Sequence, residues 1–178
     1  MNKVLIVVDC QNDFIFGALG TPEARGIVDN VLQKVIEARK SNDTIIFTKD
    51  LHYEEDYCDS VESAFVPRHC MANENGHWII ECLRPYTDYL ALKSTYGYVF
   101  WDNWNNILED ADFIEVIGVF TDICVISNVL MLRSLYPTIP IVVDESCCAG
   151  TTPAAHRAAL TVMESCNIEV IKRNLIDF

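Results

Sequence analysis

Short apolar runs alternate with longer amphipathic segments along most of this chain. Residues 4–8 are all aliphatic, which is typical of a strand buried on both faces. Residues 27–36 then repeat their apolar positions at helical spacing. The same patterns predict further strands at 44–48, 89–92, 113–119, 139–143 and 168–171, and helices at 101–109, 122–135 and 153–166. Strands that alternate with helices indicate βαβ units and a parallel sheet.

The predicted fold class is therefore α/β. We expect a three-layer, doubly wound fold with a mainly parallel central sheet, formed by a single domain over residues 1–178. A length of 178 residues suits one domain, and a hydrophobic content of 51% supplies a core. Thr152 and Pro153 are placed to cap and begin the last helix.

Charge and cysteine usage narrow the class of partner. The chain has 13 Lys+Arg against 26 Asp+Glu, so no nucleic acid and no anionic membrane surface is expected to bind. No apolar run approaches the roughly 18–20 residues that span a bilayer, and the start lacks a signal-peptide pattern. We expect a soluble, cytoplasmic protein. Its 8 cysteines are expected to be mostly buried thiols, because the chain has an ample core and no export signal, and the absence of a CxxC pair disfavours a structural zinc site.

Four predicted strands end in residues that can do chemistry. Asp9, Asp50 and Lys93 each follow or end a strand, and a turn leading to Cys124 follows another. The carboxyl ends of parallel strands meet at one edge of a sheet, which is where such folds bind ligands. The sequence therefore predicts one site that contains these groups.

Cys124 is the candidate nucleophile, because it lies where a buried strand passes into a helix. Backbone N–H groups there are expected to lower its pKa from about 8.5 and to form an oxyanion hole. Asp9 could act as its base and acid, and Lys93 could stabilise a thiolate. The alternatives are a buried structural cysteine, a capping aspartate and a solvated lysine.

The stretch from 51 to 87 lacks regular periodicity, and such long connections are usually functional. Asp50 and His52 stand two residues apart, so their side chains point the same way from an extended segment. His69 follows a Pro turn, and Glu62 lies between the two histidines. These nitrogen and oxygen donors suit Zn²⁺, Mn²⁺ or Fe²⁺. The other histidines lack such partners, and His156 is expected to be a core or supporting residue.

These residues together resemble the isochorismatase-like cysteine hydrolases, and within them the nicotinamidases (pyrazinamidases). The matching segments span nearly the whole chain: Asp9-x-Gln11-x-Asp13-Phe14, Asp50-x-His52, Pro67-x-His69, Leu92-Lys93 and Gly118-Val119-x-Thr121-x-x-Cys124-Val125.

The resemblance implies a Cys124 nucleophile, an Asp9 acid and base, and a supporting Lys93. It also implies a cis peptide between Val119 and Phe120, with the N–H groups of Phe120 and Cys124 as the oxyanion hole. The presence of the cysteine argues against the vinyl-ether cleavage of the isochorismatases proper, which lack it.

The resemblance also implies one divalent metal ion, with zinc favoured over manganese or iron. Its implied ligands are Asp50, His52, Glu62 and His69, and the implied ring-binding residues are Phe14, Val66 and Tyr96. Three positions depart from the nicotinamidase pattern: Leu51 replaces a common Trp, Val66 replaces an aromatic residue, and Asp56 or Cys58 takes the place of a further histidine.

The function predicted from the sequence is metal-assisted hydrolysis of nicotinamide to nicotinate and ammonia, through a thioester on Cys124. One alternative is a related cysteine hydrolase that acts on another small amide or carbamoyl compound. Another is a catalytically silent binding protein of the same fold. A nucleotide-binding protein is disfavoured, because no glycine-rich phosphate loop is present. We expect a small-molecule amide as partner and a homo-oligomer.

Overall fold

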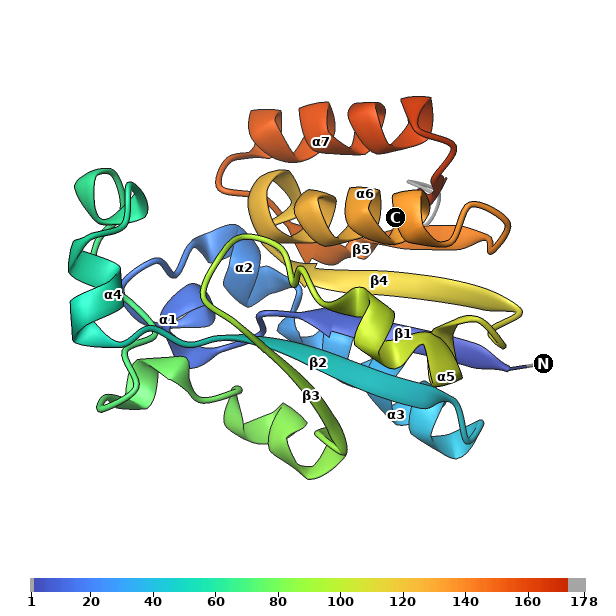
Figure 1. Ribbon diagram of the computed structural model, residues 1–178, viewed down its shortest axis with the longest axis horizontal. Helices are drawn as coiled ribbons and strands as arrows, with labels where there is room; N and C mark the ends of the chain where they lie inside the picture. The colour runs from blue at the N-terminus through green and yellow to red at the C-terminus, as the bar shows by residue number, and fades with distance from the viewer. Residues whose placement is uncertain (1, 173–178) are drawn as a thin grey trace, which may run out of the picture.

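A six-stranded sheet forms the centre of the computed structural model, which describes residues 2–172 (Figure 1). The strand order is β3-β2-β1-β4-β5-β6, and all five strand pairs are parallel. This confirms the predicted α/β fold class. The strands are β1 (Lys3–Val8), β2 (Thr44–Asp50), β3 (Tyr89–Lys93), β4 (Phe113–Val119), β5 (Ile141–Ala149) and β6 (Glu169–Ile171).

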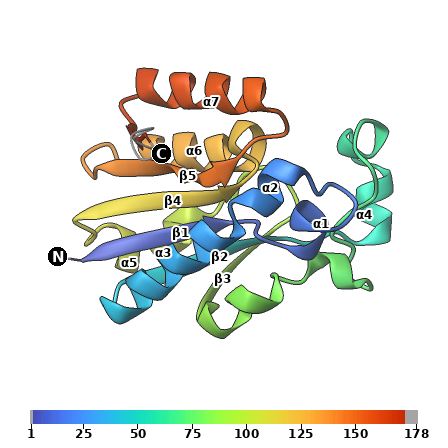
Figure 2. The ribbon, with the colours of Figure 1, turned by 180° about the vertical axis from the view of Figure 1, so that it is seen from behind.

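Helices cover both faces of this sheet. The α-helices are α1 (Asn12–Ile15), α2 (Pro22–Gly26), α3 (Val28–Lys40), α4 (Glu54–Cys58), α5 (Asn105–Leu108), α6 (Ile126–Leu135) and α7 (Pro153–Ser165). The face seen in Figure 2 carries α2 and α3, whereas α5 and α6 lie on the face seen in Figure 1. The cap of α7 is as predicted, because the Thr152 hydroxyl accepts the Ala155 N–H at 3.1 Å. No helix in the described residues is long and apolar enough to cross a membrane.

The long connection between β2 and β3 is irregular, as predicted, but it contains short helical turns. Besides α4 it holds the 3₁₀ turns η1 (Glu62–Ala64), η2 (Asn75–His77) and η3 (Glu81–Tyr86). A fourth 3₁₀ turn, η4 (Trp101–Trp104), precedes α5. The helix predicted at 122–135 begins instead as a π-helical turn, η5 (Thr121–Val125), and α6 continues from it.

Strand β5 is longer than the predicted 139–143. The polar residues 144–146 interrupt its apolar run, and the pairing with β4 shifts register between Val116 and Gly118. Lys34 stabilises Asp144 in this irregular part at 2.8 Å. Buried residues 147–149 then resume the strand. Because residues 144–146 are polar, the sequence pattern predicted that the strand ends before them, although β5 continues to Ala149.

The site region lies where the direction of winding changes, between β1 and β4. Gly118 has a φ of 121°, and a β-carbon there would clash with the carbonyl oxygen of Val8. Only glycine allows the two central strands to approach so closely at this position. Asp9 and the turn that carries Cys124 follow these two strands, so they emerge side by side.

Candidate active site

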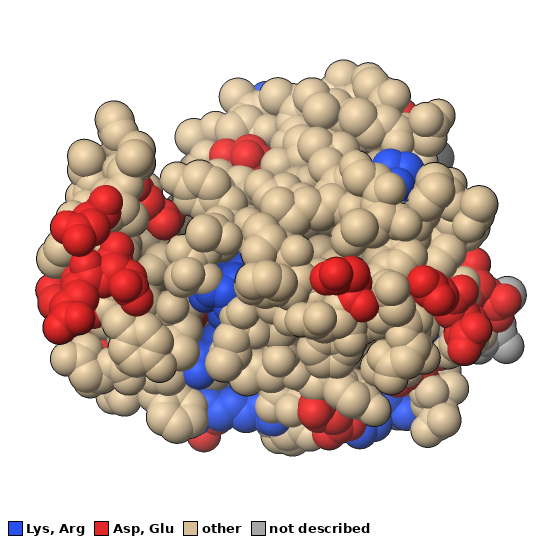
Figure 3. Space-filling model, in the orientation of Figure 1, with Lys and Arg blue, Asp and Glu red and all other residues tan. Residues whose placement is uncertain are grey.

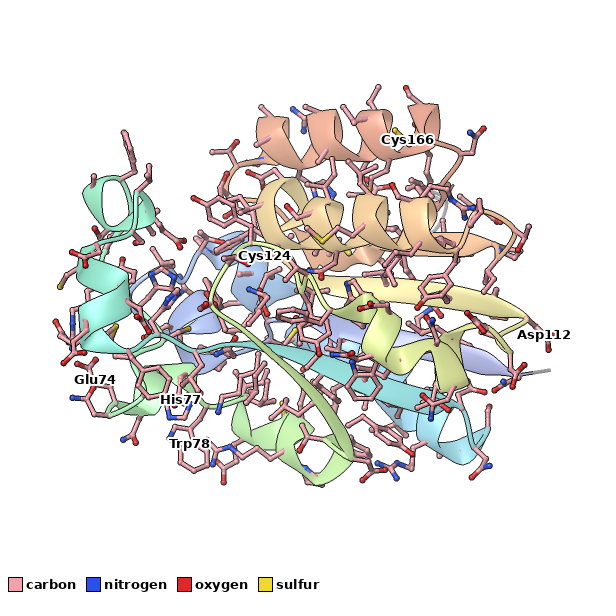
Figure 4. The ribbon with its side chains drawn as sticks, in the orientation of Figure 1. Glu74, His77, Trp78, Asp112, Cys124 and Cys166 are labelled. Atoms are coloured by element: carbon pink, nitrogen blue, oxygen red, sulfur yellow. The ribbon has the colours of Figure 1, made fainter. Side chains whose placement is uncertain are left out.

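Asp9, Lys93 and Cys124 meet at the carboxyl edge of the sheet, as the sequence predicted. Lys93 Nζ lies 2.7 Å from Asp9 Oδ2 and 3.9 Å from Cys124 Sγ. All three residues are buried. Figure 4 shows Cys124 at the carboxyl end of β4, where the chain enters the helical layer. The peptide between Val119 and Phe120 is cis, as the resemblance implied.

Thr48 holds the Asp9 carboxylate in place, a role that was not predicted from the sequence. Its hydroxyl donates to Asp9 Oδ1 at 2.7 Å and accepts the Asp9 N–H at 3.2 Å. A signal was present, because Thr48 stands two residues before Asp50 on the same strand. Side chains at that spacing lie on one face.

Burial has the largest single effect on the pKa values of Asp9 and Lys93. It raises the pKa of Asp9, and the nearby Asp50 adds to the effect, while Lys93 opposes it. Burial would lower the pKa of Lys93, but the carboxylate of Asp9 and the neighbouring Cys124 and Asp50 raise it above its ordinary range. Lys93 therefore remains a cation between two carboxyl groups.

The predicted low pKa of Cys124 is wrong. Burial raises the pKa of this thiol well above its ordinary value, and the charge of Lys93 opposes the shift without outweighing it. The turn around Cys124 is also π-helical rather than the first turn of an α-helix. The resting group is a neutral thiol, so its proton must leave as the sulfur reacts.

Asp50, His52 and His69 form a second buried cluster. His52 Nε2 and His69 Nε2 lie 3.1 Å and 3.6 Å from Asp50 Oδ2, and one ligand atom of each residue lies within 4.8 Å of the others. His69 Nδ1 lies 2.8 Å from the Pro67 carbonyl oxygen, so its Nε2 faces the cluster. Glu62 lies farther out, with Oε1 at 3.8 Å from His69 Nε2.

This cluster fits a divalent metal ion. Burial would raise the pKa of Asp50, but Lys93 and the hydrogen bonds from His52 and His69 hold it well below its usual range. Asp50 is therefore a carboxylate, and its buried Oδ1 has no hydrogen-bond partner. One oxygen and two imidazole nitrogens are the donors that Zn²⁺ and similar ions prefer.

Gln11 and Asp13 of the Asp9-x-Gln-x-Asp pattern form hydrogen bonds to the backbone that carries this cluster. The side chain of Gln11 accepts the Asp50 N–H and donates to the Asp50 carbonyl oxygen, both at 2.7 Å. Asp13 Oδ2 accepts the N–H of Cys70 at 2.7 Å, directly after His69. Such supporting contacts orient metal ligands. The sequence indicated Gln11 and Asp13 only as positions of the family motif, without this supporting role.

A pocket of about 280 Å³ joins the two groups. Its polar side includes Cys124, Asp50 and Glu62. Its apolar walls include all three predicted ring-binding residues, Phe14, Val66 and Tyr96, together with the predicted Phe120. Other lining residues were not predicted from the sequence, among them Leu19, Thr21, Ile123 and Thr151. They come from separate segments, and only Ile123 had a signal, because it precedes Cys124.

The two remaining histidines lie outside this arrangement. His77 packs beside Trp78, away from Cys124 in Figure 4, with ring centroids 5.3 Å apart. His156 is hydrogen-bonded to the Thr121 hydroxyl at 2.8 Å, which joins α7 to the turn that carries Cys124. This is the supporting position expected for His156.

Comparison with known proteins places these features in a family. The isochorismatase domain matches residues 3–174. Two curated relatives are a nicotinamidase of Schizosaccharomyces pombe, 26% identical over 96% of this chain and 93% of its own, and a probable inactive nicotinamidase of Arabidopsis thaliana, 24% identical over 94% and 91%.

Two solved structures share the fold over almost their full lengths. The pyrazinamidase of Pyrococcus horikoshii in complex with zinc has a TM-score of 0.82 and 24% identity, covering 97% of this chain and 100% of its own. The N-carbamoylsarcosine amidase of Thermoplasma acidophilum has a TM-score of 0.77 and 30% identity, covering 100% of both chains. The chain belongs to the isochorismatase family.

Proposed function

We propose that the whole chain forms one hydrolase domain that converts nicotinamide to nicotinate and ammonia through a thioester on Cys124. The observation that carries this proposal is the position of Lys93. Its Nζ lies 2.7 Å from Asp9, 3.6 Å from Asp50 and 3.9 Å from Cys124. The reactive thiol, its base and the metal cluster are thus neighbours along one pocket.

In this mechanism Asp9 takes the thiol proton as Cys124 Sγ attacks the amide carbon. The backbone N–H groups of Phe120 and Cys124 would stabilise the oxyanion, and Lys93 would stabilise the developing negative charge. Asp9 then gives the proton to the leaving nitrogen, and the C–N bond breaks to release ammonia. Water, deprotonated by Asp9, attacks the thioester and restores the thiol.

Asp50, His52 and His69 would hold a divalent ion, with Glu62 as an outer ligand. When bound, the ion would supply a Lewis-acid contact for the ring nitrogen of the substrate. The zinc in the Pyrococcus horikoshii pyrazinamidase supports zinc here. The side chains of Phe14 and Tyr96 would provide the flat walls of the ring slot.

The pocket favours an uncharged substrate over an anionic one. Asp50 and Glu62 line it, and none of the described residues lining it is a lysine or arginine. The described lining of the pocket therefore offers a carboxylate-bearing amide no lysine or arginine partner. The identity of 30% to N-carbamoylsarcosine amidase nevertheless keeps a carbamoyl compound as the second candidate substrate.

The test is ammonia release from nicotinamide and from N-carbamoylsarcosine by the zinc-loaded protein, before and after chelation. We expect nicotinamide to be the better substrate, with a loss of activity on chelation that zinc reverses. Faster hydrolysis of N-carbamoylsarcosine would establish the second candidate. Absence of ammonia from both would favour a silent protein, as the name of the Arabidopsis thaliana relative suggests for that protein.

Metal binding should be separable from catalysis by mutation. His52→Ala and His69→Ala each remove one imidazole from the cluster, so we expect both variants to lose most of the one zinc ion bound per chain. Cys124→Ala should retain it, and Glu62→Gln should bind it more weakly, because Glu62 lies at the edge. Elemental analysis after dialysis measures these contents. Full zinc content in both histidine variants would place the ion elsewhere.

Lys93 should control the protonation of Cys124. Its positive charge opposes the effect of burial, so its removal in Lys93→Ala should raise the thiol pKa further. The midpoint of Cys124 alkylation against pH should then move upward. Lys93→Arg keeps the charge and serves as the matched control, with a smaller shift. Identical alkylation profiles in wild type and Lys93→Ala would show that Lys93 has another role.

A further inference from the structure

A face of the molecule with almost no charged side chains lies beside the site. Residues 89–101 contain a single charged residue, Lys93, whose side chain is 2% exposed. Helix α6 also contains one, Arg133, which donates to the carbonyl oxygens of residues 136, 137 and 139. The whole chain has 13 basic and 26 acidic residues among 178, so these segments are strongly depleted in charge.

Large apolar side chains are exposed on this face. We call it the uncharged face and define it by Leu90, Leu92, Val99, Phe100 and Leu135. The exposed fractions are 58% for Val99 and 57% for Phe100. Two surface hollows lie along the face, one beside β3 and one beside α6, and both are lined by Tyr98 and Val99. The face is therefore continuous, and such exposed apolar patches mark interaction sites.

The space-filling view agrees with this description. In Figure 3 most of the surface over β3 and α6 is tan, with blue side chains beside β3 and a red group between β3 and α6, and the largest red groups lie at the two ends of the molecule. One end carries the acidic residues 54–56 of α4, and the other carries those at 109–112. A partner on the uncharged face would thus avoid most of the negative charge.

Strand β3 adds an open sheet edge to this face. It is the first strand of the sheet order and pairs with β2 on one side. Within residues 2–172 no backbone group pairs with its other side. Edge strands are usually protected by charge, proline or a bulge, and the one charged residue of β3, Lys93, is buried against Asp9. The opposite edge strand, β6, carries the exposed Glu169.

We propose that a second copy of this chain docks on the uncharged face, with the two β3 strands paired antiparallel about a two-fold axis. A two-fold contact brings one surface against itself, so that surface must carry little net charge. The chain has a net charge of −13, whereas residues 89–101 and helix α6 together contain only two charged residues, Lys93 and Arg133. The open edge of β3 can also form backbone hydrogen bonds with the same edge of a second copy, with the two strands antiparallel.

This contact would also reach the site. Tyr96 lies between β3 and Phe100, and it lines the pocket that contains Cys124. Docking at Leu92 and Phe100 would therefore hold both ends of the segment that carries Tyr96. This consequence rests on the proposed function, whereas the dimer itself does not.

The test is the mass of the protein in solution by light scattering after size exclusion. We expect two chains per particle for the wild type and one for Phe100→Asp. Val162→Asp is the matched control, since Val162 is 47% exposed on α7, outside the face, and should leave the mass unchanged. Leu135→Glu provides a second variant on the face and should also give single chains.

Hydrogen exchange locates the contact. Amides of residues 88–94 should exchange more slowly in the wild type than in Phe100→Asp, while those of β6 should not change. A wild type that remains a single chain at all concentrations overturns the proposal. So does a dimer whose mass survives both Phe100→Asp and Leu135→Glu, or whose β3 amides exchange as in the single chain.

Discussion

Replacing Cys124 with alanine is expected to lower kcat for amide hydrolysis by roughly 10⁴-fold or more, because removal of a covalent nucleophile has effects of that size. The sulfur forms the thioester, and no other described cysteine lines the pocket. The side chain is small, so the fold and the metal cluster should survive. Ammonia release measures the loss, and the thermal midpoint and zinc content verify the fold.

Cys148→Ala is the matched control for this variant. Cys148 is also buried, and burial also raises its pKa well above the ordinary value, but it lies on β5 outside the substrate pocket. We expect this variant to retain turnover. Comparable activity in Cys124→Ala and the wild type would exclude the thioester and leave direct attack by water.

Asp9→Asn is expected to lower kcat by about 10³-fold, within the range for the loss of a general acid and base. The amide is nearly the same size as the carboxylate, but it can neither take the thiol proton nor return it to ammonia. The raised pKa of Cys124 makes this loss larger, since the thiol does not ionise unaided. Steady-state kinetics with nicotinamide should show a large fall in kcat and little change in KM.

Thr48→Val tests the role of Asp9 without replacing the carboxylate itself. It removes the hydrogen bond to Asp9 Oδ1 and leaves the carboxylate, so activity should fall between those of wild type and Asp9→Asn. An Asp9→Asn variant that keeps more than about a tenth of wild-type kcat would assign the proton transfers to another residue, since acid–base effects are far larger.

The sequence predicted the central strands well because their burial is uniform. The aliphatic residues of β1 and the apolar residues of β4 predict buried strands. Their ends therefore placed Asp9 and the turn before Cys124 at one edge of the sheet. The end of β5 was missed because residues 144–146 are polar inside a paired strand. Their partner, Lys34, is distant in the sequence.

The candidate site was predictable in its chemistry but not in its electrostatics. Strand ends located Asp50 and Lys93, and spacing located the two histidines of the metal cluster. The pKa of Cys124 could not be predicted, because it depends on burial by residues from several segments. Pocket walls such as Thr21 and Thr151 were missed for the same reason, since nothing in their local sequence marks them.

The thioester on Cys124 is tested most directly by the mass of the Cys124 peptide during turnover. Zinc-loaded protein is mixed with nicotinamide, quenched in acid within milliseconds, digested and analysed by mass spectrometry. We predict a nicotinoyl group on the peptide that contains Cys124 and on no other cysteine peptide, together with ammonia in solution. Production of nicotinate with Cys124 unmodified at every quench time, or a nicotinoyl group on another cysteine, would contradict it.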